Sequence, residues 1–354
     1  MRSSFRPCVL TVPHRRRSVI TGAGASGERN HPIMNEPNDA ADYLAATTPV
    51  LSVNPVVLPT PGRAVDLEAR VSTPISDDDA LPVILLSHGH GNSRHLSSRN
   101  GYGPLADFYA AHGFVVIQPT HLDSKTLSLN PADPEAPLYW RSRAQDMTRI
   151  LDQLDVIEKD VPQLGGRVDR DRVAVVGHSM GGHTASLLLG ARLTDPHDGT
   201  EVNLTEPRIT AGVLLAAPGR GGDALSEFAA ENYPFLSTTD LSRMATPALV
   251  VAGDQDHSAH LTVRGAAWAT DPYFLSPGPK SLLTLFGGEH VLGGVSGYDA
   301  AETTDDSPER VAVVQRLSWA YLRSQLYPGD TAWQEACAAL TSGPRPLGKV
   351  ESKS

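Results

Sequence analysis

The sequence predicts an α/β fold with a mostly parallel central sheet flanked by helices. Short apolar runs recur along the chain, helical patterns separate them, and the runs show no alternation of polar and apolar residues. A run without alternation is typical of a strand that is buried on both faces, as in a parallel sheet. Strands that alternate with helices form an open sheet, whose sites lie at the carboxyl ends of the strands.

The expected strands are the apolar runs, and the expected helices are the patterns between them. The strands cover residues 81–87, 114–118, 172–176, 211–216, 247–252 and 281–286. A helix is expected over residues 104–111, before the stop at Gly113. The longest helical pattern runs from Tyr139 to about Glu158, with apolar residues on one stripe.

These elements predict one catalytic domain over residues 42–327, between two tails. Residues 217–246 separate two expected strands and are too long for a plain connection, so we expect a small lid-like insertion there. Residues 328–354 are expected to form a C-terminal helix and a disordered tail, because the last stretch is polar and rich in turn-forming residues.

Residues 1–41 are expected to form a disordered tail. Arginines at positions 15–17 are followed by a stretch that is too polar for a signal peptide. A second interpretation stays open, in which the protein starts at Met34 and residues 1–33 do not belong to it. Both interpretations favour a cytoplasmic protein over a secreted one, and the presence of only two cysteines fits a reducing compartment.

Composition excludes some classes of protein. The chain has 354 residues and a formal net charge of -10, with 30 Lys and Arg against 40 Asp and Glu. This balance argues against a general nucleic-acid binder, which usually has a basic surface. No apolar run is long enough for a membrane span. The oligomeric state is not indicated.

The third expected strand leads into Gly177-His178-Ser179-Met180-Gly181, and a helix follows. A G-x-S-x-G motif between a strand and a helix places its serine on a tight, strained turn, so that the hydroxyl projects above the sheet. The residues two before and two after the serine crowd this turn, which favours glycine at both positions. The motif therefore predicts Ser179 as a nucleophile.

A serine hydroxyl needs a base, and the base needs a partner that orients it. Two later strands end just before Asp254-Gln255-Asp256 and before His290, which gives the chain order serine, acid, histidine that accompanies this motif. Of the two acids, Asp256 is favoured by its position three residues after the glycine that ends the strand. Asp254 is the alternative, and otherwise caps a turn. Among the 13 histidines, His290 has its own loop after the last strand.

The oxyanion of an acyl-transfer intermediate needs preorganised N–H donors. One is the backbone N–H of Met180, directly after the nucleophile. The second is expected at His90, because His88-Gly89-His90-Gly91 follows an early strand and resembles the H-G-x-G loop of lipases and esterases. A zinc site at the two histidines is the alternative, but no third ligand stands near them, so no metal and no cofactor are expected.

Two further residues are expected in the substrate pocket. His121 follows the end of an expected strand, where a turn capped by Asp123 is an equally good interpretation. Trp140 adds aromatic surface near the entrance.

Over residues 50–327 the chain resembles the α/β-hydrolase superfamily. The H-G-x-G loop, the helix with Trp140, Arg143 and Asp146, and the segment from Gly177 to Gly182 resemble platelet-activating-factor acetylhydrolases, chlorophyllases and dienelactone-hydrolase-like proteins. Dienelactone hydrolases carry cysteine at the position of Ser179, and chlorophyllases usually carry arginine at that of Met180. The same elbow is also similar to that of cutinase-like polyester hydrolases.

The motifs and the resemblance together imply a serine hydrolase that cleaves a carboxylic ester of a small molecule through an acyl-enzyme. An amidase, a thioesterase and a polyester hydrolase use the same triad and remain alternatives. A ligand-binding protein without catalysis, on the same scaffold, is the alternative from another class. It would be favoured by the loss of a triad member, and the sequence retains all three.

Overall fold

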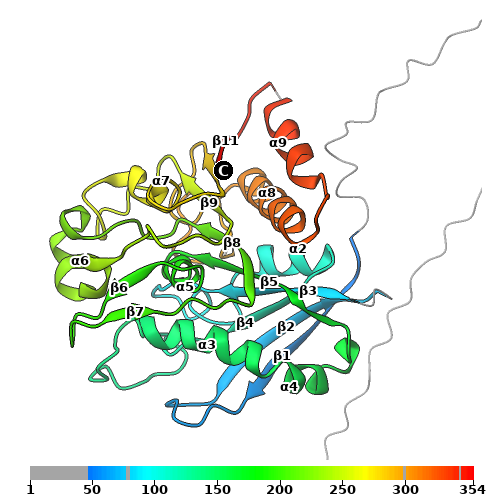
Figure 1. Cartoon of the computed structure of the whole chain (residues 1–354), viewed down its shortest axis with the longest axis horizontal. Helices are drawn as coiled ribbons and strands as arrows, with labels where there is room; N and C mark the ends of the chain where they lie inside the picture. Colours follow the sequence, from blue (N-terminus) through cyan, green and yellow to red (C-terminus); the bar gives the residue numbers. More distant parts are fainter. Residues whose placement is uncertain (1–46, 77–79, 298–299, 343) are drawn as a thin grey trace, which may run out of the picture. The chain divides into compact units, whose positions relative to one another are not determined.

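The structure is a computed structural model that describes residues 47–76, 80–297, 300–342 and 344–354 (Figure 1). These residues belong to one structural unit of the chain, residues 44–354. The expected N-terminal tail, residues 1–41, lies outside the described residues together with Met34.

A nine-stranded sheet runs through the described part of the chain, in the order β1-β2-β4-β3-β5-β8-β9-β10-β11. Its inner strands, from β4 to β10, are parallel, while β1, β2 and β11 pair antiparallel with their neighbours. The strands are β1 (Val50–Leu58), β2 (Leu67–Pro74), β3 (Leu81–Ser87), β4 (Val115–Pro119), β5 (Val168–His178), β8 (Ile209–Leu215), β9 (Ala248–Gly253), β10 (Lys280–Leu285) and β11 (Gly348–Lys353).

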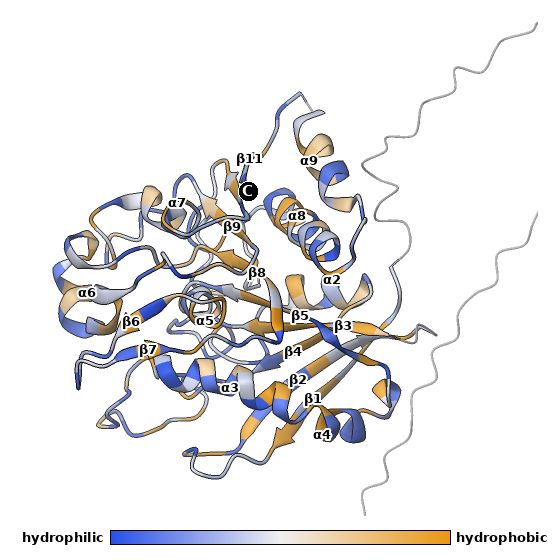
Figure 2. Ribbon diagram, in the orientation of Figure 1, coloured by the Kyte–Doolittle hydropathy of each residue, from blue (hydrophilic) through white to orange (hydrophobic). Residues whose placement is uncertain are grey.

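All the expected strands are inner strands of this sheet, from β3 to β10 in chain order, so the predicted mostly parallel α/β fold is confirmed. Figure 2 shows that the central strands are mainly apolar. In β3 and β9 every residue is buried, which explains why their sequences do not alternate. A separate two-stranded sheet pairs β6 (Arg192–Thr194) with β7 (Glu201–Asn203).

Helices cover both faces of the sheet. The sheet divides the apolar core into two layers, one on each face. One layer contains α3, α4 and α5, and the other contains α2, α8 and α9. The helices are α2 (Gly103–Ala111), α3 (Trp140–Asp152), α4 (Leu154–Asp160), α5 (Met180–Leu188), α6 (Glu227–Asn232), α7 (Asp271–Phe274), α8 (Pro308–Leu326) and α9 (Ala332–Ser342). Short 3₁₀ turns are η1 (Pro162–Leu164), η2 (Gly222–Ala224), η3 (Pro234–Thr238) and η4 (Gly265–Thr270). The single helix expected over 139–158 is divided at Gln153, whose backbone leaves the helical region.

The C-terminal stretch corrects one expectation. It was expected to be disordered, but residues 348–353 form the edge strand β11, which pairs with β10 from Lys280–Lys353 to Leu285–Gly348. The backbone hydrogen bonds of an exposed edge order this polar segment, and its charged side chains are typical of an edge strand. The helix expected after residue 327 is α9, which packs against α8.

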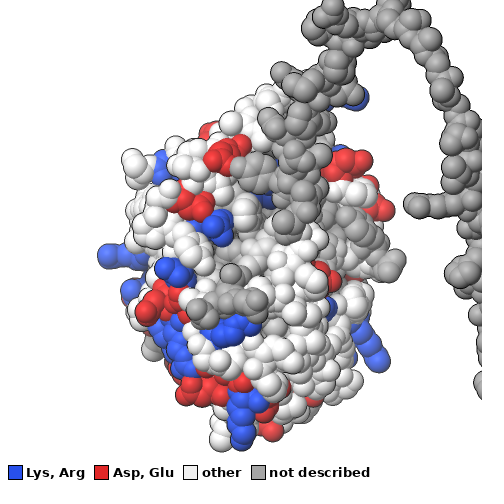
Figure 3. All heavy atoms as spheres, turned by 90° about the vertical axis from the view of Figure 1, so that its right-hand side faces the viewer, with Lys and Arg blue, Asp and Glu red and all other residues white. Residues whose placement is uncertain are grey.

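Charged side chains of both signs lie intermingled on the face shown in Figure 3. The acidic excess of the sequence therefore does not gather into one patch on that face. Within the described residues, no helix has both the length and the apolar character needed to cross a membrane.

Candidate active site

Ser179 occupies a sharp turn between β5 and α5. Its backbone has φ 55° and ψ −118°, in the left-handed half of the map that non-glycine residues rarely adopt. A Cβ on Gly177 would lie 2.0 Å from the carbonyl oxygen of Gly181, and a Cβ on Gly181 would lie 2.1 Å from that of Ser87. Both glycines are therefore required by the close approach of the backbone, as the motif predicted.

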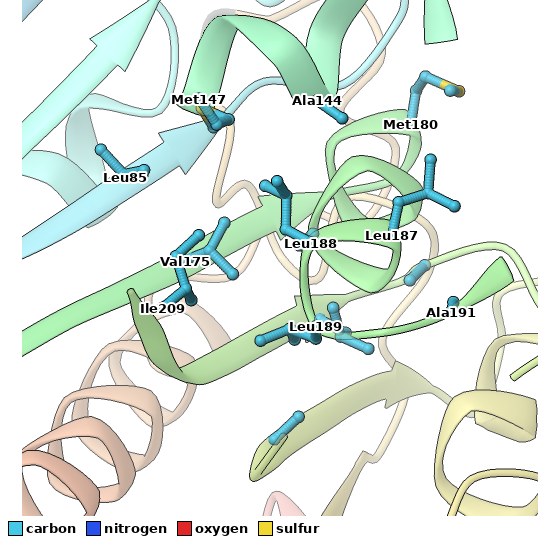
Figure 4. Packing of buried hydrophobic residues seen from close by; sticks show 14 of the residues in the cluster. Leu85, Ala144, Met147, Val175, Met180, Leu187, Leu188, Leu189, Ala191 and Ile209 are labelled. Atoms are coloured by element: carbon cyan, nitrogen blue, oxygen red, sulfur yellow. The ribbon is translucent and has the colours of Figure 1, made fainter. Parts of the chain in front are cut away.

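The helix that follows Ser179 is held firmly against the sheet. Figure 4 shows Leu188 of α5 between Met147 of α3 and Val175 of β5, and all three belong to one buried cluster. This packing fixes the N-terminus of α5 beside the serine. The free N–H groups of a helix N-terminus favour negative charge, so the turn suits an oxyanion.

The structure brings Ser179, His290 and Asp256 together in one line of hydrogen bonds. Nε2 of His290 lies 2.8 Å from Oγ of Ser179, and Nδ1 of His290 lies 2.9 Å from Oδ2 of Asp256. Because a carboxylate only accepts, Nδ1 carries the proton and Nε2 is free to accept one from the serine. The two loops after β9 and β10 supply these side chains from positions far apart in the sequence.

Asp256 is well suited to remain ionised beside the histidine. Burial alone would raise its pKa, but the hydrogen bond and charge of His290 and the hydroxyl of Ser258 lower the pKa below its usual value. Oγ of Ser258 donates to Oδ1 of Asp256 at 2.5 Å and also lies 3.1 Å from Nδ1 of His290. Sequence reasoning missed Ser258, although it stands only two residues after the acid.

Asp254, the alternative acid, makes a different contact. Its Oδ1 accepts the backbone N–H of Gly287 at 2.7 Å and so ties the loop after β9 to the loop after β10. The structure places it at a turn, and the side chain that reaches His290 is that of Asp256.

His90 and Met180, whose backbone N–H groups are the expected oxyanion donors, both line the cavity that contains Ser179. Neighbouring side chains hold the loop of His90 in place. Nδ1 of His90 lies 3.0 Å from Oδ2 of Asp123, and Oε1 of Glu302 accepts the backbone N–H of Ser93 at 2.8 Å. The loop is therefore anchored at both ends.

A buried arginine lies behind this loop. Arg143 of α3 is fully buried, and its guanidinium donates to Asp123, to the backbone carbonyl of His88 and to Oγ1 of Thr184. Burial would raise the pKa of Asp123, but the charge of Arg143 and the hydrogen bond from His90 hold it well below its usual value. Arg143 entered the sequence interpretation only through a family resemblance, and its role depends on contacts with three separate segments.

His121 does not line the cavity at Ser179, so the expected substrate contact does not hold. The side chain is fully buried, with Nε2 3.0 Å from Oγ of Ser87 and Nδ1 3.0 Å from Oδ2 of Asp146. Burial and the charge of Arg143 lower the pKa of His121 to about 4, so the ring is neutral. Both ring nitrogens are used within the protein, which leaves none for a substrate.

Trp140 also lies outside the cavity at Ser179. It stacks on Phe235 with ring centroids 5.8 Å apart and lines a second, smaller cavity of about 220 Å³. Leu138 lines both cavities, so the expected aromatic surface lies beside the site and not within it.

The cavity at Ser179 has a volume of about 910 Å³. Part of its wall comes from residues 217–246, between β8 and β9, which contribute Pro218, Phe228, Tyr233 and Leu236. Hydrogen bonds connect this segment to the loop after Asp256. Thr262 bonds the carbonyl of Ala224 at 2.7 Å, and Ser226 bonds that of His260 at 2.6 Å.

The burial of Arg143 leads to a prediction about stability. Replacing Arg143 with methionine leaves the carboxylate of Asp123 buried without its counter-charge, which should lower the free energy of unfolding by about 3–5 kcal/mol. The control is Arg70→Met, which removes the exposed pair with Asp107 and should cost about 0–1 kcal/mol. Urea unfolding of both variants measures the difference, and equal losses would contradict the prediction.

The chain is similar in sequence to three platelet-activating factor acetylhydrolases. It is 26% identical to that of Cavia porcellus over 155 residues and 28% identical to that of Canis lupus familiaris over 158 residues, in each case 34% of both chains. It is 30% identical to that of Bos taurus over 143 residues, which cover 30% of this chain and 31% of the relative. The chain thus spans about a third of the length of the curated relatives it matches, and no family model matches it. With its mostly parallel sheet and the turn at Ser179, the chain has the α/β-hydrolase fold and is similar to the platelet-activating-factor-acetylhydrolase-like branch of the serine esterases.

Proposed function

We propose that this protein is a serine hydrolase that cleaves a carboxylic ester through an acyl-enzyme, with Ser179 as nucleophile, His290 as base and Asp256 as the acid that orients the base. The observation that carries the proposal is the unbroken line of hydrogen bonds from Oγ of Ser179 through both ring nitrogens of His290 to Asp256. This is the geometry that general-base activation of a hydroxyl requires.

In the proposed reaction, Oγ of Ser179 attacks the carbonyl carbon of the ester while Nε2 of His290 takes the serine proton. The backbone N–H groups of His90 and Met180 stabilise the negative oxygen of the tetrahedral intermediate. The intermediate collapses, and the leaving alcohol takes the proton back from His290. A water then attacks the acyl-enzyme with His290 again as base, and the carboxylic acid leaves.

The cavity supports an ester with a small acyl group and a larger alcohol part. The names of the relatives state that they remove an acetyl group from platelet-activating factor. A volume of about 910 Å³ is far more than an acetyl group fills, and apolar side chains such as Leu138, Phe228 and Leu261 contribute to its walls. We therefore propose that the remaining space accommodates an apolar alcohol portion.

Trapping the acyl-enzyme tests the proposal. Rapid mixing with p-nitrophenyl acetate should release an initial burst of p-nitrophenolate, and mass spectrometry of the quenched enzyme should find an acetyl group on the peptide that contains Ser179. Turnover without an acylated serine, or activity that is lost to a chelator and restored by zinc, would contradict it.

A panel of substrates separates the alternatives that share this triad. p-Nitrophenyl esters of increasing acyl length, with one matched anilide and one matched thioester, should show the highest kcat/KM for the short-chain esters. A preference for the anilide or the thioester would reassign the protein to the amidases or thioesterases. Binding of these compounds without any turnover would favour the non-catalytic alternative.

A further inference from the structure

Two buried side chains connect the loop of His90 to the loop of His290. The backbone N–H of Gly89 donates to the hydroxyl oxygen of Tyr102 at 2.8 Å, and this oxygen lies 2.8 Å from Nδ1 of His178. Nε2 of His178 lies 2.8 Å from the backbone carbonyl oxygen of His290. The chain of hydrogen bonds thus begins one residue before the expected oxyanion donor and ends at the base.

The partners fix the direction of every bond in this chain. A carbonyl oxygen only accepts, so Nε2 of His178 carries the proton and its Nδ1 is an acceptor. The hydroxyl of Tyr102 must then donate to Nδ1 while it accepts from Gly89. No donor or acceptor in the chain is left over, and substitution of either side chain would leave a buried polar group without a partner.

Burial keeps this chain in one protonation state. Tyr102 is 0% exposed and His178 is 1% exposed. Burial, together with the charge of the neighbouring His290, lowers the pKa of His178 to about 3, and burial raises the pKa of the Tyr102 phenol. His178 therefore stays neutral at neutral pH.

Resting on the proposed function, we propose that Tyr102 and His178 are positioning residues, which hold the oxyanion donor of His90 and the base His290 at fixed places on either side of Ser179. His178 directly precedes Ser179 in the chain. Its hydrogen bonds therefore hold both loops relative to the backbone at Ser179. Stabilisation of an oxyanion requires donors about 2.7–3.1 Å from the oxygen, and a misplacement of about 1 Å can cost about 10²-fold in rate.

A matched pair of tyrosine variants tests this proposal. Tyr102→Phe removes the hydroxyl from the chain. Tyr109→Phe removes the hydroxyl of an equally buried tyrosine on α2, which bonds Oγ of Ser318 on α8 at 2.6 Å and has no part in the chain from Gly89 to His290. Tyr102→Phe loses two buried hydrogen bonds and should cost about 2 kcal/mol of unfolding free energy, and Tyr109→Phe loses one and should cost about 1 kcal/mol. Only Tyr102→Phe should lower kcat for p-nitrophenyl acetate, by about tenfold or more, with KM little changed.

The variant His178→Gln adds a thermodynamic cycle. Its side-chain amide can still donate to the carbonyl of His290 but cannot reproduce the imidazole contact with Tyr102. If both residues act through one chain, the double variant with Tyr102→Phe should lose no more kcat than the more damaged single variant. Fully additive losses, or equal kcat in Tyr102→Phe and Tyr109→Phe, would overturn the proposal.

Hydrogen exchange gives a readout that does not depend on activity. After correction for the difference in global stability, the amides of residues 89–91 should exchange faster in Tyr102→Phe than in Tyr109→Phe, because the N–H of Gly89 loses its acceptor. Unchanged exchange would overturn the positioning role even in an active enzyme. A wild-type protein that hydrolyses no ester would contradict the proposed function instead, and the exchange measurement would still decide whether Tyr102 holds the loop.

Discussion

The variant Ser179→Ala should fold like the wild type and lose ester hydrolysis by a factor of about 10⁴ or more. In the proposed mechanism, the substitution removes the hydroxyl that attacks the substrate and leaves His290 without a group to activate. Alanine carries the same Cβ as serine and is smaller, so it adds no steric clash to the strained turn. Hydrolysis of p-nitrophenyl acetate, corrected for the uncatalysed rate, measures the loss.

Ser186→Ala is the matched control for this variant. Ser186 lies on α5, the helix that follows Ser179; it is also buried, and its Oγ bonds the carbonyl of Gly182 at 2.9 Å. It should retain activity within a few-fold of the wild type. Wild-type turnover by Ser179→Ala, or an equal loss in both variants, would remove Ser179 from the mechanism.

The variant Asp256→Asn should lower kcat by about 10³- to 10⁴-fold. An amide in place of the carboxylate no longer stabilises the proton on Nδ1 of His290, so the ring loses the tautomer that leaves Nε2 free for the serine. The change alters little volume, and the hydroxyl of Ser258 retains an oxygen to bond. Circular dichroism and thermal unfolding confirm the fold while kcat is measured.

Comparison with the variant Asp254→Asn tests which of the two aspartates is the acid. Asp254 bonds the N–H of Gly287 and does not reach His290, so its variant should lose about 1 kcal/mol of stability and less than about tenfold in kcat. A larger loss of kcat at position 254 than at 256 would reverse the assignment. The two positions differ by two residues in sequence, so general damage to the loop would affect both alike.

The parallel strands in the core of this fold can be predicted from the sequence, because burial on both faces produces continuous apolar runs. Edge strands give no such signal. The last strand, β11, has the sequence Gly-Lys-Val-Glu-Ser-Lys, and its order comes from hydrogen bonds to β10, more than sixty residues away in the chain. From polar composition alone, residues 348–353 were expected to be disordered. In the structure, β10 supplies the hydrogen-bond partners that order them.

In the candidate site too, some residues can be predicted from the sequence and others cannot. Ser179, Asp256 and His290 each follow a strand end, and position in the fold made them recognisable. The side chains around them are recognisable only by contact. Arg143 meets Asp123 across 20 residues and Tyr102 meets His178 across 76, distances that no local pattern encodes. His121 also follows a strand end, but its partners turn it into the interior.

The hydrogen bonds from Ser226 and Thr262 have a consequence for redesign of this protein. They join the cavity wall at residues 217–246 to the loop that begins at Asp256. Under the proposed function, the segment that limits the size of the substrate is thus connected to the loop of the acid that orients the base. An engineer who widens the cavity by rebuilding residues 217–246 would shift the acid as well. Selection for a new substrate should therefore alter rate and selectivity together, unless Ala224 and Ser226 keep their bonds to the acid loop.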